Sequence, residues 1–143
     1  MQVVFLYIIG ATLLIHSIRA LMAMGGWQWQ QRFWMLRISE LVQVFFVLLA
    51  LPVRSWFWLA SGFALSRLMA VAELAVASWN SRRPPSILAP VNLAAVIAAL
   101  CTAVTGYWGV FAVAYPLYWI ASIWAGRRIV ERVMSNSGAG AKI

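Results

Sequence analysis

Long apolar runs, separated by short polar, glycine-containing or proline-containing segments, dominate this chain. A run of about 20 apolar residues is long enough to cross the hydrocarbon core of a bilayer as a helix. Runs of this kind occupy residues 3–24, 34–53, 55–79, 87–105 and 107–126. The pattern therefore predicts an all-α bundle of five transmembrane helices that forms one domain over residues 1–134. The small, polar residues 135–143 are expected to form a flexible cytoplasmic tail.

The segments between the runs support this division. Residues 27–34 alternate tryptophan with amide side chains, a composition suited to the headgroup zone, and predict an interfacial loop. Residues 80–89 contain two arginines and a Pro-Pro pair, which cannot continue a membrane helix. The last division depends on Gly106 and Gly109. Without a turn there, the end of the chain would be one long bent element or a re-entrant pair, which leaves the alternative of four full spans.

The distribution of positive charge predicts the orientation, because cytoplasmic loops hold an excess of Lys and Arg. With five spans and the N-terminus outside, Arg54 is alone on the outer side. Four spans would place the basic tail outside, so the charges favour five spans with a cytoplasmic C-terminus. The first run lacks preceding positive charge and is expected to be a retained helix rather than a signal peptide. The basic residues assigned to cytoplasmic loops and tail are Arg32, Arg82, Arg83, Arg127, Arg128, Arg132 and Lys142.

Composition changes this picture only by excluding alternatives. Hydrophobic residues make up 64% of the chain and charged residues 10%, which leaves too few polar residues to cover a water-exposed surface. The net charge of +8 is scattered between apolar runs rather than clustered on one face. That pattern argues against nucleic-acid binding and favours contact with anionic lipids at the cytoplasmic face. The short loops suggest a bacterial inner (plasma) membrane.

Familiar catalytic and metal-binding patterns are absent from the sequence. His16 is the only histidine and Cys101 the only cysteine, which excludes a bis-histidine haem and a thiolate metal site. The serines lack the His/Asp set that nucleophilic catalysis needs, and no glycine-rich nucleotide motif occurs. We therefore expect no catalytic residue, no metal and no cofactor.

Polar residues inside the spans are the best functional candidates, because an ionised group at membrane depth costs at least a few kcal/mol. They form one stripe on the first helix and another on the second, and both are expected to face inward. The first stripe is Thr12, His16 and Arg19, and the second is Arg37, Glu40 and Gln43.

The third helix adds two charges at greater depth. At about 1.5 Å per residue, Glu73 lies roughly 9 Å in from Trp79, and Arg67 lies roughly 18 Å in, near the bilayer midplane. The predicted topology brings these groups together in the cytoplasmic leaflet. The candidate cluster is His16, Arg19, Arg37, Glu40, Arg67 and Glu73.

This cluster has a structural and a functional interpretation. In the structural one, Arg67 pairs with Glu40 or Glu73 and locks the second helix against the third. In the functional one, the cluster lines a cytoplasmic pocket for an anionic headgroup, a quinone or a proton path. A charge from another subunit could also complete the set.

Small residues on two helices predict close helix contacts. The face on the third helix consists of Gly62, Ser66, Ala70, Glu73 and Ala77, and that on the fourth of Ala95, Ala99 and Ala103.

Three function classes follow. The first is a non-catalytic subunit or assembly factor of a larger inner-membrane complex, working through its sides with other membrane subunits or by self-association. The second is a small transporter, channel or lipid- or quinone-binding protein that uses the Arg/Glu cluster. The third, ranked last, is a small enzyme acting on a lipid-soluble substrate.

Overall fold

The structure, a computed structural model, describes residues 1–24, 34–82 and 87–141, and over these ranges the chain forms α-helices joined by short turns. The predicted interfacial loop lies outside these ranges, except for its last residue. The predicted all-α class is confirmed, and the helices begin and end within two residues of the predicted runs except at the end of the last one. They are α1 (Gln2–Met24), α2 (Trp34–Val53), α3 (Trp56–Ser81), α4 (Leu88–Thr105) and α5 (Trp108–Ala141).

Four of these helices are long and apolar enough to cross a membrane. The qualifying segments are Gln2–Met22, Trp56–Asn80, Leu88–Thr105 and Trp108–Ala125. The remaining helix, α2, packs between α1 and α3 and turns large apolar side chains outward. The outward-facing side chains of α2 include Leu41, Phe45 and Leu48.

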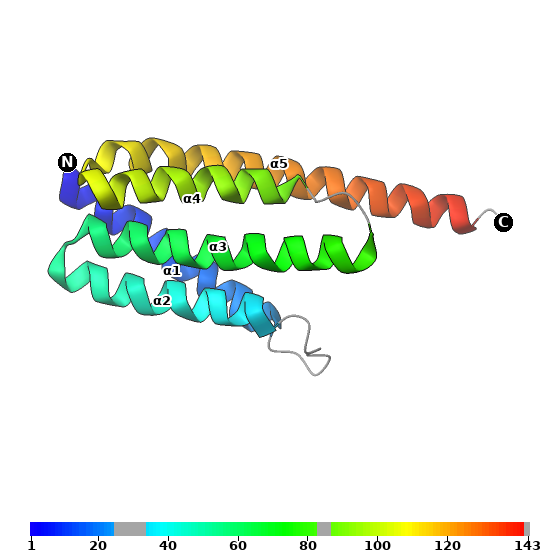
Figure 1. Cartoon of the computed structure of the whole chain (residues 1–143), viewed down its shortest axis with the longest axis horizontal. Helices are drawn as coiled ribbons and strands as arrows, with labels where there is room; N and C mark the ends of the chain where they lie inside the picture. Colours follow the sequence, from blue (N-terminus) through cyan, green and yellow to red (C-terminus); the bar gives the residue numbers. More distant parts are fainter. Residues whose placement is uncertain (25–33, 83–86, 142–143) are drawn as a thin grey trace.

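Consecutive helices pack side by side, and α5 makes a sparse contact with α1. Figure 1 shows the N-terminus, the α2–α3 turn and the α4–α5 turn at one end, with the C-terminus at the other. The contact between α1 and α5 is sparser than that between any two consecutive helices. In Figure 1, α1 begins beside the start of α5 and ends beside α2, so the two helices diverge along the bundle.

A buried threonine organises the turn between α4 and α5. Gly106 adopts a left-handed conformation with φ of 75°, and its N–H donates to the carbonyl of Thr102 at 2.9 Å. The Thr102 hydroxyl accepts the N–H of Phe111 at 3.1 Å and so caps the first turn of α5. The predicted break at Gly106 is thus confirmed, whereas Gly109 lies inside α5.

Helices α2 and α3 approach each other closely at Gly62. A Cβ atom added there would clash with Phe46 Cβ and would lie 2.7 Å from Phe46 Cγ. On the next interface, Ala95 and Ala99 of α4 are buried. The predicted small residues Gly62, Ala95 and Ala99 therefore lie at helix contacts, whereas Ala77 of the predicted face on α3 is exposed.

The last helix is longer than the sequence predicts. Instead of ending at residue 126, α5 continues to Ala141, so residues 135–141 of the predicted flexible tail are helical. At 1.5 Å per residue, its 34 residues span about 51 Å. Figure 1 shows its end projecting beyond the other helices. The apolar pattern that defined the run ends at residue 126, whereas the helical backbone continues to Ala141.

Candidate functional site

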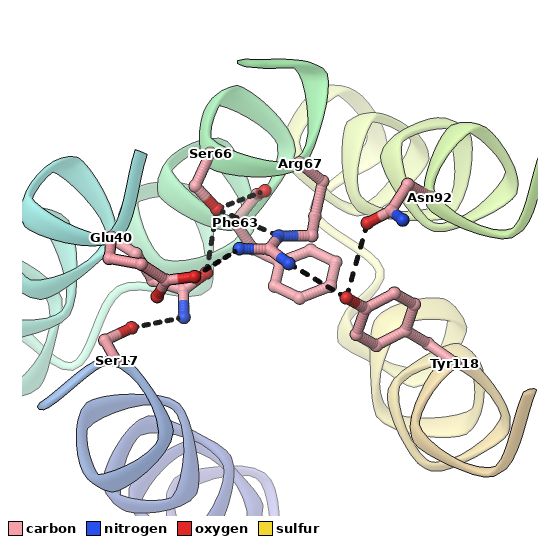
Figure 2. A network of polar contacts seen from close by, with 8 residues as sticks. Ser17, Glu40, Phe63, Ser66, Arg67, Asn92 and Tyr118 are labelled. Atoms are coloured by element: carbon pink, nitrogen blue, oxygen red, sulfur yellow. Dashed lines mark hydrogen bonds and ion pairs between the residues drawn. The ribbon is translucent and has the colours of Figure 1, made fainter. Parts of the chain in front are cut away.

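A continuous network of polar side chains crosses the interior of the bundle and takes at least one residue from every helix (Figure 2). Its members lie on the inner faces of their helices, among apolar core side chains such as Phe63 and Val47. The residues of this five-helix network are Ser17 of α1, Glu40 and Gln43 of α2, Ser66 and Arg67 of α3, Asn92 of α4 and Tyr118 of α5.

Arg67 is the centre of the network, and its side chain is almost fully buried. Nη2 donates to Glu40 Oε1 at 3.0 Å, in an ion pair whose two side chains are each 9% exposed. Nη1 donates to the hydroxyl of Tyr118 at 2.9 Å. Nε lies 3.4 Å from the hydroxyl of Ser66, to which it donates. Every nitrogen of the guanidinium therefore has an acceptor from the protein itself.

One arm of the network joins Arg67 to α4. The Tyr118 hydroxyl accepts from Arg67 and donates to Asn92 Oδ1 at 3.3 Å. The Asn92 amide in turn donates to the carbonyl of Leu88 at 2.7 Å. The Tyr118 hydroxyl and the Asn92 amide each accept one hydrogen bond and donate another, so these polar groups are satisfied inside the bundle.

The other arm joins Arg67 to α1. The Ser66 hydroxyl lies 2.7 Å from Gln43 Oε1, and Gln43 Nε2 donates to Ser17 Oγ at 2.7 Å. Ser66 also lies 3.0 Å from the carbonyl of Phe63, so its single proton has two acceptors. This arm ties α3 to α2 and α2 to α1.

Glu40 uses only part of its carboxylate. Oε1 accepts from Arg67, whereas Oε2 is buried and receives no hydrogen bond from the residues that the structure describes. A carboxylate can accept at both oxygens. The buried ion pair is thus neutral in net charge, with one acceptor position unused.

The structure divides the predicted cluster. Glu40 and Arg67 form the ion pair that the structural interpretation proposed, and Gln43 is buried as its stripe predicted. Arg37 is half-buried one turn before Glu40. Glu73 is half-buried on α3 and takes no part in the network as far as the described residues show.

The stripe on α1 faces a different way from the prediction. Thr12 and Arg19 are exposed and His16 is half-buried, so the expectation that this stripe points inward is wrong for its two ends. His16 packs edge-on against Trp119 of α5, with ring centroids 4.5 Å apart. The stripe lines an open space between α1 and α5, because these two helices diverge.

Three members of the network, Ser17, Asn92 and Tyr118, were not among the residues predicted from the sequence. Ser17 is the buried polar residue of α1, one position after His16, and helix rotation rather than composition decides which of the two points inward. Asn92 interrupts the otherwise apolar run of α4. A lone amide in a membrane span is a signal that could have found it.

The residue types in the network limit the chemistry that the site can perform. Among the described residues, no group of three or more His, Cys, Asp or Glu could hold a metal ion. No family model matches the chain, and no curated protein or solved structure matches it either. By their length and apolar composition, four of the described helices suit a small, multi-span membrane protein.

Proposed function

We propose that this protein is a non-catalytic subunit or assembly factor of a larger membrane complex, acting through the sides of its helices. The observation that carries the proposal is the coordination of Arg67. All of its nitrogens have protein acceptors, so the most costly charge in the interior is accounted for without a substrate. The five-helix network then serves to fix the bundle.

The outer surface supports the same proposal. Large apolar side chains are exposed on every helix, and these faces can meet only lipid or other membrane helices. We further propose that α2 crosses the membrane with the other four helices. The basic end of the bundle, including Arg82 and the projecting part of α5, then faces the cytoplasm of a bacterial inner membrane.

The test is gentle extraction of the tagged protein from its native membrane, followed by mass measurement of the intact assembly. We expect other protein chains in a fixed ratio. A chain recovered alone or only with copies of itself would overturn the proposal.

A double variant tests the structural role of the ion pair. Replacing Arg67 and Glu40 together by Met keeps the interior filled, and such replacement of a buried ion pair is often neutral in stability. The double variant should keep the partner chains in the same ratio. The single Arg67→Met variant is the matched comparison. It leaves a buried carboxylate unpaired and should be destabilised by about 3–5 kcal/mol. A stable, well-folded double variant that loses its partners would contradict the structural role.

A further inference from the structure

The space between α1 and α5 is an open groove rather than a closed interface. Two pockets adjoin there, because Thr12 and Trp119 line both of them. The pocket nearer the N-terminus of α1 has a volume of about 400 Å³, and the one nearer its C-terminal end about 500 Å³. We call the two together the α1–α5 groove. The larger pocket, the wide end of the groove, is on the side toward which α1 and α5 diverge, and the smaller pocket is its narrow end.

The two ends of the groove differ in chemistry. The narrow end is lined mainly by apolar and aromatic side chains, including Ile8, Ala112 and Pro116. The wide end contains His16 and Arg19. Arg19 is exposed, and within the described part of the chain it has no hydrogen bond or ion pair. A cation that has no partner among the described residues therefore lies at one end of a mainly apolar groove.

We propose that the α1–α5 groove binds an anionic phospholipid, with its phosphate at Arg19 and one acyl chain along α1. Charge complementarity selects the anion, since a guanidinium forms strong, charge-assisted hydrogen bonds with phosphate. The imidazole of His16, beside Arg19 on the groove wall, offers a further polar contact to the headgroup.

The dimensions of the groove agree with this occupant. One leaflet of the hydrocarbon core is about 15 Å thick, half of the ~30 Å total. At 1.5 Å per residue, ~15 Å along α1 reaches from Arg19 to Ile9, which lines the apolar pocket. An acyl chain whose headgroup is at Arg19 thus fills both pockets. Arg19 also lies toward the basic end of the bundle, where the headgroups of the cytoplasmic leaflet are proposed to be.

A second groove provides an internal comparison. The pocket between α4 and α5, of about 440 Å³, is lined by apolar side chains and Tyr118, without a charged residue. It is similar in size to each of the two pockets of the α1–α5 groove but lacks the cation that would select an anionic headgroup. This inference does not rest on the proposed subunit function, because lipid retention can be measured whether or not partner chains are found.

The experiment measures retained lipid by mass spectrometry of the intact protein. The full chain, purified in an uncharged detergent, is titrated with phosphatidylglycerol or with phosphatidylcholine of identical acyl chains. We expect one phosphatidylglycerol per chain and weaker retention of phosphatidylcholine. Arg19→Gln should weaken phosphatidylglycerol binding by about tenfold. Arg82→Gln makes the same change of charge at the same end of the bundle and should leave binding unchanged. Equal retention of the two lipids, or an equal loss in both variants, would overturn the proposal, since attraction would then be non-specific.

A pair of alanines on α5 tests the position of the acyl chain. Ala112 lines the α1–α5 groove and Ala114 lines the pocket between α4 and α5, and both are half-buried. Ala112→Phe should reduce phosphatidylglycerol retention, whereas Ala114→Phe should not. Thermal unfolding of both variants shows that any loss does not come from misfolding. Unchanged retention in Ala112→Phe, or a second protein chain in place of lipid in the same spectra, would overturn the assignment of the groove.

Discussion

A guanidinium inside a membrane-spanning bundle must find acceptors within the protein, because the lipid around the bundle offers none. Arg67 finds them on two other helices and on its own, and one of the three acceptors carries the compensating charge. The sequence could predict that Arg67 needs a carboxylate but not which one. Glu73 follows Arg67 by six residues on the same helix, about 9 Å along the axis and on a different face, whereas the reach of Glu40 depends on how α2 packs against α3.

The Tyr118 hydroxyl provides a test at this scale. Tyr118→Phe removes the acceptor of Arg67 Nη1 and the donor to Asn92 Oδ1, and leaves both groups unsatisfied. We expect a loss of about 1–3 kcal/mol in the free energy of unfolding, measured by titration with a denaturing detergent. Tyr107→Phe is the control, because that side chain is exposed at the α4–α5 turn, and its effect should stay within about 0.5 kcal/mol. Equal effects of the two changes would mean that the network contributes little to stability.

Helices follow from sequence more reliably than the contacts between them. The apolar runs placed the boundaries of α1 to α4 closely, because a membrane span has a fixed length and its breaks contain glycine, proline or charge. The pattern failed at α5, where a helix continues beyond its apolar part. It also could not show that α1 turns its polar stripe toward α5, since that depends on how the helices diverge.

Two glycines allow a matched test of helix contact. Gly62→Ala places a methyl group against Phe46 Cβ, an atom fixed to the α2 backbone, so α2 and α3 must separate. Gly10→Ala instead meets Leu51 Cδ2 at 2.6 Å, the free end of a side chain that can rotate away. Both changes gain about 1 kcal/mol of helix propensity.

Gly62→Ala should therefore destabilise the protein by about 1–3 kcal/mol. Gly10→Ala should be neutral or slightly stabilising. Unfolding of the two variants under the same conditions compares them directly. If the Gly62→Ala protein were as stable as the Gly10→Ala protein, α2 and α3 would have room for a methyl group at residue 62, and the close contact with Phe46 would be refuted.

At the scale of the whole molecule, the two ends of the bundle differ in charge. Arg54 is exposed in the α2–α3 turn, which lies at the same end as the N-terminus, whereas the exposed Arg82 follows the end of α3 at the other end of the bundle. Arg127 and Arg128 are exposed in the second half of α5, which runs toward that other end (Figure 1). This asymmetry is the basis for the expected orientation, with the N-terminus outside.

Cysteine labelling tests that orientation without altering any charge. In a Cys101→Ser background, Val53→Cys and Asn80→Cys place single exposed thiols near opposite ends of the bundle. A membrane-impermeant maleimide should label Val53→Cys in intact cells, and Asn80→Cys only after permeabilisation. The Cys101→Ser parent should remain unlabelled. The reverse labelling pattern would refute the orientation, and with it the assignment of the basic end to the cytoplasm.

The arrangement of the five-helix network also bears on how the protein is made. Glu40 and Arg67 are separated by 27 positions, whereas Tyr118 follows Arg67 by 51. The ion pair and the arm through Ser66 and Gln43 need only the first three helices. During translation, the most costly charge can therefore be neutralised before α4 and α5 leave the ribosome. The last two helices then join a partly stabilised bundle, to which they add Asn92 and Tyr118.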